Sequence, residues 1–298
     1  KMTISLPKVV KINDNAFSGT PIDSLNFPLL KELGDNAFYN CDVLEDINLP
    51  ALKSMGNNVF SLCSNLKSVN LPTVNTIGSV SFYLCSSLTS ISLPSLKEIN
   101  GTGAFSYCSL ETINLPNLEI AGGGDFANNE KLIEVYLPKL KGVPSGMFSE
   151  CESLTSINLP EVTEIDASFW SCTNLVNVDL PKLERAGNYA FLNCIGLISI
   201  SLPKVVEIGS STFNGCENLA SVNMPLVEEI GSNVFEGTSI TDLSLPKVRI
   251  VGASAFANTK IKNLELPLAE SLGSGLFEGN YVLKTLEIGG GEGWSGFS

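Results

Sequence analysis

The cysteines are the residues of this chain whose type and number could support chemistry. The 298 residues contain eight of them, each three residues after a phenylalanine: Cys41, Cys63, Cys85, Cys108, Cys151, Cys172, Cys194 and Cys216. Five further copies of the same spacing hold Thr20, Asn129, Thr238, Thr259 and Asn280. Exchange among Cys, Thr and Asn favours a small, semi-buried position where a polar atom meets the backbone at a turn. We therefore predict free thiols with a structural role.

The chain contains no histidine, which argues against most metal sites and catalytic triads. Zinc sites need closely paired cysteines, usually with histidine, and serine or cysteine triads need an imidazole base. Cysteines in stacked repeats would also have parallel Cβ directions, which suits a disulfide poorly. The Gly122–Gly124 run lacks the lysine of a phosphate-binding loop. The sequence therefore predicts no metal site, no cofactor and no enzymatic activity.

Net charge limits the possible partners. The chain carries 31 acidic and 18 basic side chains, a formal net charge of −13. Nucleic-acid binding requires a basic surface, so we expect no nucleic-acid partner. No apolar run approaches the ~18 residues that suggest a membrane span, so we also expect no membrane insertion.

A repeat of about 22 residues must position all of these side chains. Its form is clear in Leu197–Cys216, LISISLPKVVEIGSSTFNGC, and 13 of the 15 prolines and 13 of the 15 phenylalanines recur at fixed positions in its copies. A fixed period of this length is typical of a solenoid, in which each unit buries its apolar face against its neighbours. We predict one elongated domain over residues 1–288. Residues 289–298 form a Gly-rich tail or linker, and we expect the chain to be a fragment of a longer protein.

The repeat predicts a mostly β fold with short helical or 3₁₀ turns. The L-x-x-I-x-L segment alternates as a strand does, and the proline that follows cannot donate the next ladder hydrogen bond. About 13 such strands would stack into a parallel inner sheet. The return segment is too short for a full helix, so we expect a short second strand and one helical turn around F-x-x-C. Strands on both sides predict shallow curvature.

The period slips between Asn100 and Pro144. One residue is added near Asn100, and one is missing after Cys108. Gly122–Gly124 and Pro144 replace the usual turn residues. Such changes are typical of drift in surface loops, and a reshaped edge beside a ligand is the alternative.

The repeat resembles the BspA-type leucine-rich repeat, also called the Treponema pallidum type. The resemblance rests on Leu44-x-x-Ile47-x-Leu49-Pro50, Ile77-Gly78, Ala37-Phe38 and Phe38-x-x-Cys41 and covers residues 2–288. It implies a secreted or surface-anchored bacterial protein that binds host or bacterial proteins as an adhesin. It implies no catalytic residues.

The first candidate binding surface is a column of outward-facing side chains on the inner sheet. Each repeat contributes the residue between the Ile and the second Leu of L-x-x-I-x-L. The column is an Asn/Ser ladder interrupted by one aromatic residue, Tyr136. Because aromatic anchors dominate protein interfaces, we predict a ligand-binding patch formed by Asn114, Glu134, Tyr136, Asn158 and Asp179. The alternative is a solvated face whose stacked amides hydrogen-bond one another.

A second candidate lies directly after the phenylalanines, where Tyr39, Tyr83 and Trp170 occupy equivalent positions. Exposed aromatics along one edge could stack on sugars or on a protein, and partial burial against neighbouring turns is the alternative. Asn100-Gly101-Thr102 is a glycosylation acceptor only in an organism that glycosylates it.

Together these features predict a non-enzymatic, extracellular or cell-surface binding protein of a bacterium. The expected partner is a host or bacterial surface or matrix protein. A carbohydrate-binding module of a larger surface protein, with a glycan as ligand, is the first alternative, and a structural stalk that displays another domain is the second.

Overall fold

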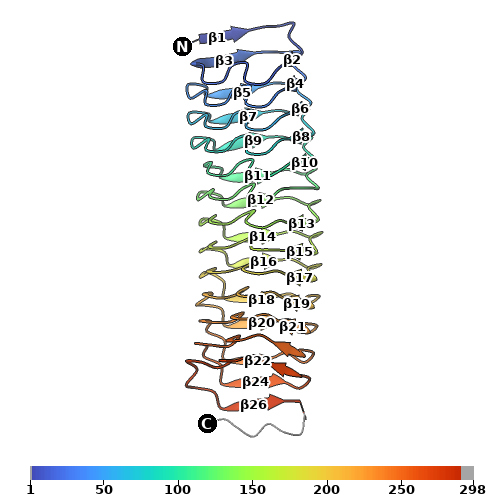
Figure 1. The fold of residues 1–298 in the computed structure, drawn as a ribbon, viewed down its shortest axis with the longest axis vertical. Coiled ribbons are helices and arrows are strands. Elements are labelled where there is room, and N and C mark those ends of the chain that lie inside the picture. The colour runs from blue at the N-terminus through green and yellow to red at the C-terminus, as the bar shows by residue number, and fades with distance from the viewer. Residues whose placement is uncertain (1, 290–298) are drawn as a thin grey trace.

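Each repeat forms one coil of a rod. The computed structural model describes residues 2–289, whose coils stack from one end to the other (Figure 1). One side carries strands of three to five residues, which we call the first sheet, and the other side carries two-residue strands, which we call the second sheet. The first sheet is the predicted inner sheet, and the second contains the predicted short return strands.

The strands of the first sheet are β1 (Met2–Ser5), β3 (Ile22–Asn26), β5 (Asp46–Asn48), β7 (Ser68–Asn70), β9 (Ser90–Ser92), β11 (Thr112–Asn114), β12 (Glu134–Tyr136), β14 (Ser156–Asn158), β16 (Asn177–Asp179), β18 (Ser199–Ser201), β20 (Ser221–Asn223), β22 (Asp242–Ser244), β24 (Asn263–Leu266) and β26 (Thr285–Ile288). Those of the second sheet are β2 (Lys11–Ile12), β4 (Glu32–Leu33), β6 (Ser54–Met55), β8 (Thr76–Ile77), β10 (Glu98–Ile99), β13 (Gly142–Val143), β15 (Glu164–Ile165), β17 (Arg185–Ala186), β19 (Glu207–Ile208), β21 (Glu229–Ile230), β23 (Ile250–Val251) and β25 (Ser271–Leu272). All pairings are parallel and, apart from a register shift between Met2 and Thr3, join equivalent residues, as between Asn48 and Asn70.

The rod is nearly straight, which confirms the prediction of shallow curvature (Figure 1). Strands occupy both sides of the regular coils, so both sides stack at the same spacing of about 4.8 Å. A helical side would need 8–10 Å per unit and would bend the rod.

A column of phenylalanine rings runs through the core. Rings of successive coils lie 5.0 to 5.8 Å apart between centroids and within 17° of parallel, from Phe17 to Phe277. The rings between these two ends are fully buried, as are most of the inward Leu and Ile side chains. The core is therefore continuous along the described chain.

The short helical turn predicted around F-x-x-C is wrong for the described residues, which form a run of hydrogen-bonded turns instead. In the coil of Phe38, the N–H groups of Asn36, Phe38 and Asn40 donate to carbonyls of the next coil at 2.8–2.9 Å. Asn36 and Asn40 hold positive φ angles of 54° and 56° on either side of the ring. A helix would direct these N–H groups along its own axis, so inter-coil bonding excludes it.

The eight thiols are free, as predicted, and they are buried rather than semi-buried. Each Sγ donates to the carbonyl of the phenylalanine one coil earlier, as from Cys63 to Phe38 at 3.3 Å and from Cys194 to Phe169 at 3.1 Å. Stacking of the next coil covers the thiol completely. The position is therefore a buried hydrogen-bonding link between coils.

Asn129 occupies this position for a specific reason. In a regular coil, the N–H of the following leucine donates to the cysteine carbonyl, as from Leu66 to Cys63 at 3.0 Å. One residue is missing after Cys108, and the N–H of Leu110 donates instead to Oδ1 of Asn129 in the next coil at 3.0 Å. The amide of Asn129 also donates to the carbonyls of Phe105 and Phe126, both at 2.9 Å. The missing residue and the asparagine therefore compensate each other.

The irregular region between Asn100 and Pro144 interrupts the second sheet. Five strands end at β10 and seven begin at β13, and the coil between them keeps only an isolated bridge at Ile120. In this coil the completely buried Asp125 accepts hydrogen bonds from the N–H groups of Ala104 at 3.1 Å and Gly122 at 2.6 Å. The Gly-rich tail predicted for residues 289–298 lies outside the described residues from residue 290 onward.

Candidate binding surfaces

The first sheet places the predicted patch on consecutive strands. Asn114 lies opposite Tyr136 on β11 and β12, and Asn158 lies opposite Asp179 on β14 and β16. These four residues and Glu134 are exposed, and the ring of Tyr136 is 53% exposed. The sequence therefore located the five side chains correctly on one face. Their role in binding remains a prediction.

Hydrogen bonds within the Asn/Ser ladder support its alternative interpretation in part. Nδ2 of Asn70 donates to Oδ1 of Asn48 at 3.0 Å, and Nδ2 of Asn223 donates to Oγ of Ser201 at 3.0 Å. Side-chain bonds of this kind stabilise neighbouring strands. Away from Tyr136, this column can therefore serve the sheet itself.

Sequence reasoning missed a second outward column on the same face. It consists of the residue after the buried leucine of L-x-x-I, and in five successive coils it holds Ile133, Thr155, Val176, Ile198 and Ala220. Ile133, Val176 and Ile198 are 53%, 41% and 57% exposed. Earlier coils hold Asp23, Glu45, Lys67, Thr89 and Glu111 in this column, and later ones hold Thr241, Lys262 and Lys284. We call Ile133, Thr155, Val176, Ile198 and Ala220 the apolar stripe.

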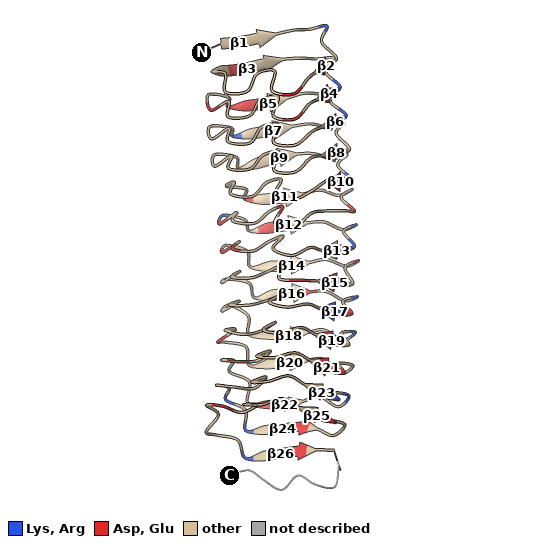
Figure 2. Cartoon of the chain, in the orientation of Figure 1, with Lys and Arg blue, Asp and Glu red and all other residues tan. Residues whose placement is uncertain are grey.

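Part of the apolar stripe borders a shallow hollow of about 600 Å³ over β16, β18 and β20. Val176 and Asp179 both line it. Strands β14, β18 and β20 carry no charged side chain (Figure 2). Comparison of equivalent positions across repeats could have found the stripe, because polar and charged residues flank it on both sides.

The edge aromatics do not form one surface. Tyr39 and Tyr83 are half-buried and Trp170 is 41% exposed, with one coil between Tyr39 and Tyr83 and three between Tyr83 and Trp170. The ring of Tyr83 packs edge-on against Tyr107 with centroids 5.7 Å apart. This packing agrees with the alternative of partial burial for Tyr83.

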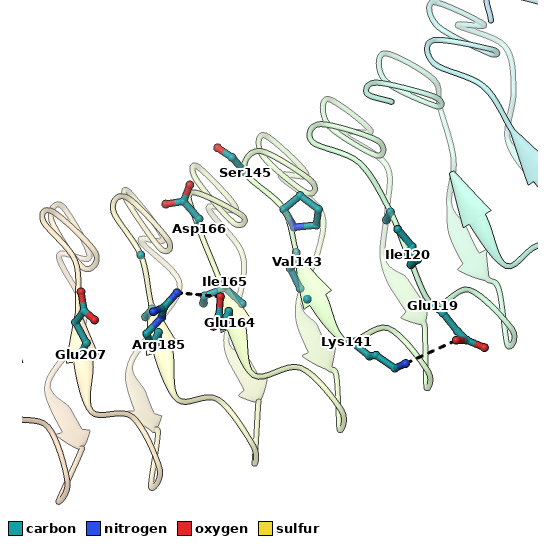
Figure 3. Close-up of a pocket in the computed structure, with 15 residues that line it drawn as sticks. Glu119, Ile120, Lys141, Val143, Ser145, Glu164, Ile165, Asp166, Arg185 and Glu207 are labelled. Atoms are coloured by element: carbon teal, nitrogen blue, oxygen red, sulfur yellow. Dashed lines mark hydrogen bonds and ion pairs between the residues drawn. The ribbon is translucent and has the colours of Figure 1, made fainter. Parts of the chain in front are cut away.

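Another hollow lies on the second sheet, beside the irregular region. It measures about 840 Å³ and is lined by residues of β13, β15, β17 and β19 and of the coil before them (Figure 3). Glu119 pairs with Lys141 at 3.8 Å, and Glu164 pairs with Arg185 at 3.1 Å. We call this hollow the Gly142 groove, because Gly142 lies on its floor. The predicted patch did not include it.

The cysteine thiols of the described residues are buried and held in their neutral form. Burial raises the pKa of every cysteine thiol, to about 12 for Cys108, Cys151 and Cys216, so the thiolate is not available as a nucleophile. Within residues 2–289, no cluster of three His, Cys, Asp or Glu side chains could hold a metal ion. The same residues contain no helix long and apolar enough to cross a membrane.

The stacked repeat also identifies the family. The model of the BspA type leucine rich repeat region matches overlapping segments at residues 2–103, 53–175, 99–220 and 184–291. The chain belongs to the BspA-type leucine-rich repeat family. BspA-type repeats form a solenoid suited to protein–protein interaction, and such solenoids are generally non-enzymatic.

Solved leucine-rich repeat proteins are similar to this chain along most of its length. A leucine-rich repeat protein from Bacteroides ovatus is 27% identical, with 84% of this chain and 80% of that chain covered and a TM-score of 0.60. A leucine-rich repeat protein from Eubacterium ventriosum is 22% identical, with 72% and 75% covered and a TM-score of 0.49. A leucine rich cell surface protein from Faecalibacterium prausnitzii is 21% identical, with 89% and 87% covered and a TM-score of 0.45. Comparison with curated protein sequences gives no match.

Proposed function

We propose that this chain is a non-enzymatic adhesion protein of a bacterial cell surface, and that it binds another protein through the centre of the first sheet. The observation that carries the proposal is the apolar stripe, in which Ile133, Val176 and Ile198 are each at least 41% exposed. Contiguous exposed apolar side chains with a polar rim are typical of protein-binding sites. Tyr136 on the same face supplies an aromatic anchor.

The chemistry of the stripe favours a protein over a glycan. Sugar-binding surfaces stack their ligands on aromatic rings, whereas the stripe offers aliphatic side chains and the same face adds one tyrosine, Tyr136. Family membership and the implied role of BspA-type proteins support the surface location. The proposed ligand is a host or bacterial surface or matrix protein.

A binding screen with matched variants tests this proposal. The chain is applied to immobilised matrix proteins, to surface proteins of neighbouring bacteria and to a glycan array. We expect binding to at least one protein and a loss of about tenfold or more in affinity for Ile198→Ser and for Tyr136→Ala. Lys262→Ser, in the same column as Ile198 but outside the stripe, is the control and should bind as the wild type does.

Two outcomes contradict the proposal. Binding to glycans alone would assign the chain to the carbohydrate-binding alternative, and binding to neither class would favour a stalk. Thermal unfolding of each variant shows whether a loss of binding reflects a loss of fold. Antibody labelling of intact cells tests the surface location separately, and labelling only after permeabilisation would overturn it.

A further inference from the structure

Gly142 is not required by the backbone. It belongs to the outward column of the second sheet, where other coils hold Glu98, Glu164, Arg185 and Glu207. Its φ is not in the left-handed region, and an added Cβ would meet nothing nearer than the carbonyl oxygen of Glu164 at 3.9 Å. By contrast, a Cβ on Gly122 would lie 1.5 Å from the carbonyl oxygen of Gly101. Glycine at 142 therefore leaves open space rather than relieving a clash.

That space is the floor of the Gly142 groove. On one side of it stands Ile120, 55% exposed, and on the other stands the Glu164–Arg185 ion pair (Figure 3). Strand pairing of the second sheet is interrupted at the same place, between β10 and β13. The coil of Gly142 has Pro144 where most coils have glycine. Proline has no N–H, so this coil lacks the donor that would pair with the coil of Ile120. The groove thus lies where the sheet is most open.

The charges that line the groove are unbalanced. Four carboxylates, of Glu119, Glu164, Asp166 and Glu207, face two cationic side chains, of Lys141 and Arg185. Both cations are already paired, with Glu119 and Glu164. Among the described residues, no ion pair involves Asp166 or Glu207. A ligand with positive charge would complement the two remaining carboxylates.

We propose that the Gly142 groove binds an extended, basic segment of a partner protein. One apolar side chain of the segment fills the space over Gly142 and packs against Ile120. Lysine or arginine side chains that lie beyond it, over the later coils, pair with Asp166 and Glu207 (Figure 3). The groove lies on the opposite side of each coil from the apolar stripe, so the rod has two binding surfaces that work independently.

Selection of peptides from a random dodecapeptide library displayed on phage tests this inference. The library is first depleted on the Gly142→Ile variant, which fills the groove with a side chain that the same column already holds at Ile250. The remaining phage are selected on the full chain. We expect enriched peptides in which lysine or arginine residues lie on one side of an apolar residue. No enrichment over the depleted library, or enrichment of acidic peptides, would overturn the proposal.

Charge variants then separate specific recognition from general attraction. The double variant Asp166→Asn with Glu207→Gln should weaken binding of an enriched peptide about tenfold and reduce its dependence on salt. Glu229→Gln, one coil beyond Glu207 in the same column and outside the groove, is the control and should change little. Equal losses in the two cases would contradict a defined site. Tyr136→Ala should leave peptide binding unchanged, so this test and the test of the apolar stripe can fail separately.

Discussion

The coils around Phe60 and Phe126 share one core but satisfy their backbones differently. In the coil of Phe60, the N–H of Gly56 donates to the carbonyl of Leu33 one coil earlier at 2.9 Å. In the coil of Phe126, the N–H of Gly122 donates to the side chain of Asp125 at 2.6 Å, and the sheet strand is lost. The ring stacking is the same in both places, at 5.4–5.8 Å.

The difference shows which part of the repeat is indispensable. The phenylalanine column continues through the irregular coil, whereas the second sheet stops and begins again. Core packing therefore holds the coils in register, and edge hydrogen bonds can be exchanged for side-chain substitutes. The exchange opens the Gly142 groove on the outside without breaking the rod.

The largest effect should follow loss of the shared core. Phe60→Ala and Phe126→Ala should each destabilise the rod by about 3–5 kcal/mol, because each leaves a cavity among fully buried rings. Phe277→Ala, at a partly buried ring near the end of the stack, should cost clearly less. Urea unfolding followed by circular dichroism measures all three. A much smaller cost at Phe126 than at Phe60 would show that the irregular coil does not share the continuous core.

The next largest effect concerns Asp125, whose carboxyl group accepts the hydrogen bonds that replace strand pairing in the irregular coil. Burial raises the pKa of Asp125 to about 7, against the opposing effect of backbone N–H donors. Between an unfolded pKa of about 3.8 and this value, the folded state binds more protons than the unfolded state. Stability should therefore fall as the pH rises from about 4 to about 7, by at most about 4 kcal/mol.

Thermal unfolding at a series of pH values measures this dependence. Asp125→Asn should flatten the part of the profile that belongs to this carboxyl group. Ser81→Ala is the matched control, because Ser81 occupies the equivalent position in a regular coil and its hydroxyl does not titrate there. An unchanged profile in Asp125→Asn would show that Asp125 remains charged in the folded protein over this whole range.

The sequence was sufficient for whatever depends on repetition. The strands, the straight rod, the free thiols and the exposure of Tyr136 all follow from a periodic pattern with alternating burial. The absence of a helical turn around Phe38 could not be predicted, because only the stacked coils reveal that alternate N–H groups bond across coils. The burial of Asp125 was missed for a similar reason, since a single aspartate in a Gly-rich stretch looks like a surface turn residue.

The candidate site was predicted only in part. Tyr136 stood out because it is unlike every other residue in its column. Ile133 and Ile198 were missed because their column was not compared across the repeats, although charged and polar residues hold this position in the coils on both sides. The Gly142 groove depends on an absent side chain and on a break in strand pairing. Neither is visible before the coils are stacked.

A smaller effect should follow from replacing Asn129, whose side chain compensates for the residue that is missing after Cys108. Asn129→Cys restores the residue of the regular repeat but leaves the N–H of Leu110 without its acceptor at 3.0 Å. We expect a loss of about 1–3 kcal/mol, the cost of a buried polar group without a partner. Insertion of one residue after Ser109 should restore the regular turn and recover most of the stability. Failure of the insertion to rescue Asn129→Cys in urea unfolding would contradict this compensation.

The smallest effect lies at the boundary between regular and irregular coils. Val80 holds a φ of 47°, in a column where earlier coils have Asn15, Asn36 and Asn58 and the next coil has Gly103. A left-handed conformation costs a residue with a Cβ about 1–2 kcal/mol, and a β-branched residue is among the least suited to it. Asparagine adopts this conformation more readily because its short polar side chain can hydrogen-bond locally.

Val80→Asn should therefore raise the free energy of unfolding by about 1 kcal/mol, which thermal unfolding can resolve. Val206→Asn is the control, because Val206 is 40% exposed and is not among the residues with positive φ. It should change stability little. A gain at Val206 as large as that at Val80 would indicate a general benefit of polar surface. A loss at Val80 would mean that the packing of its side chain against the coil of Gly103 outweighs the backbone strain.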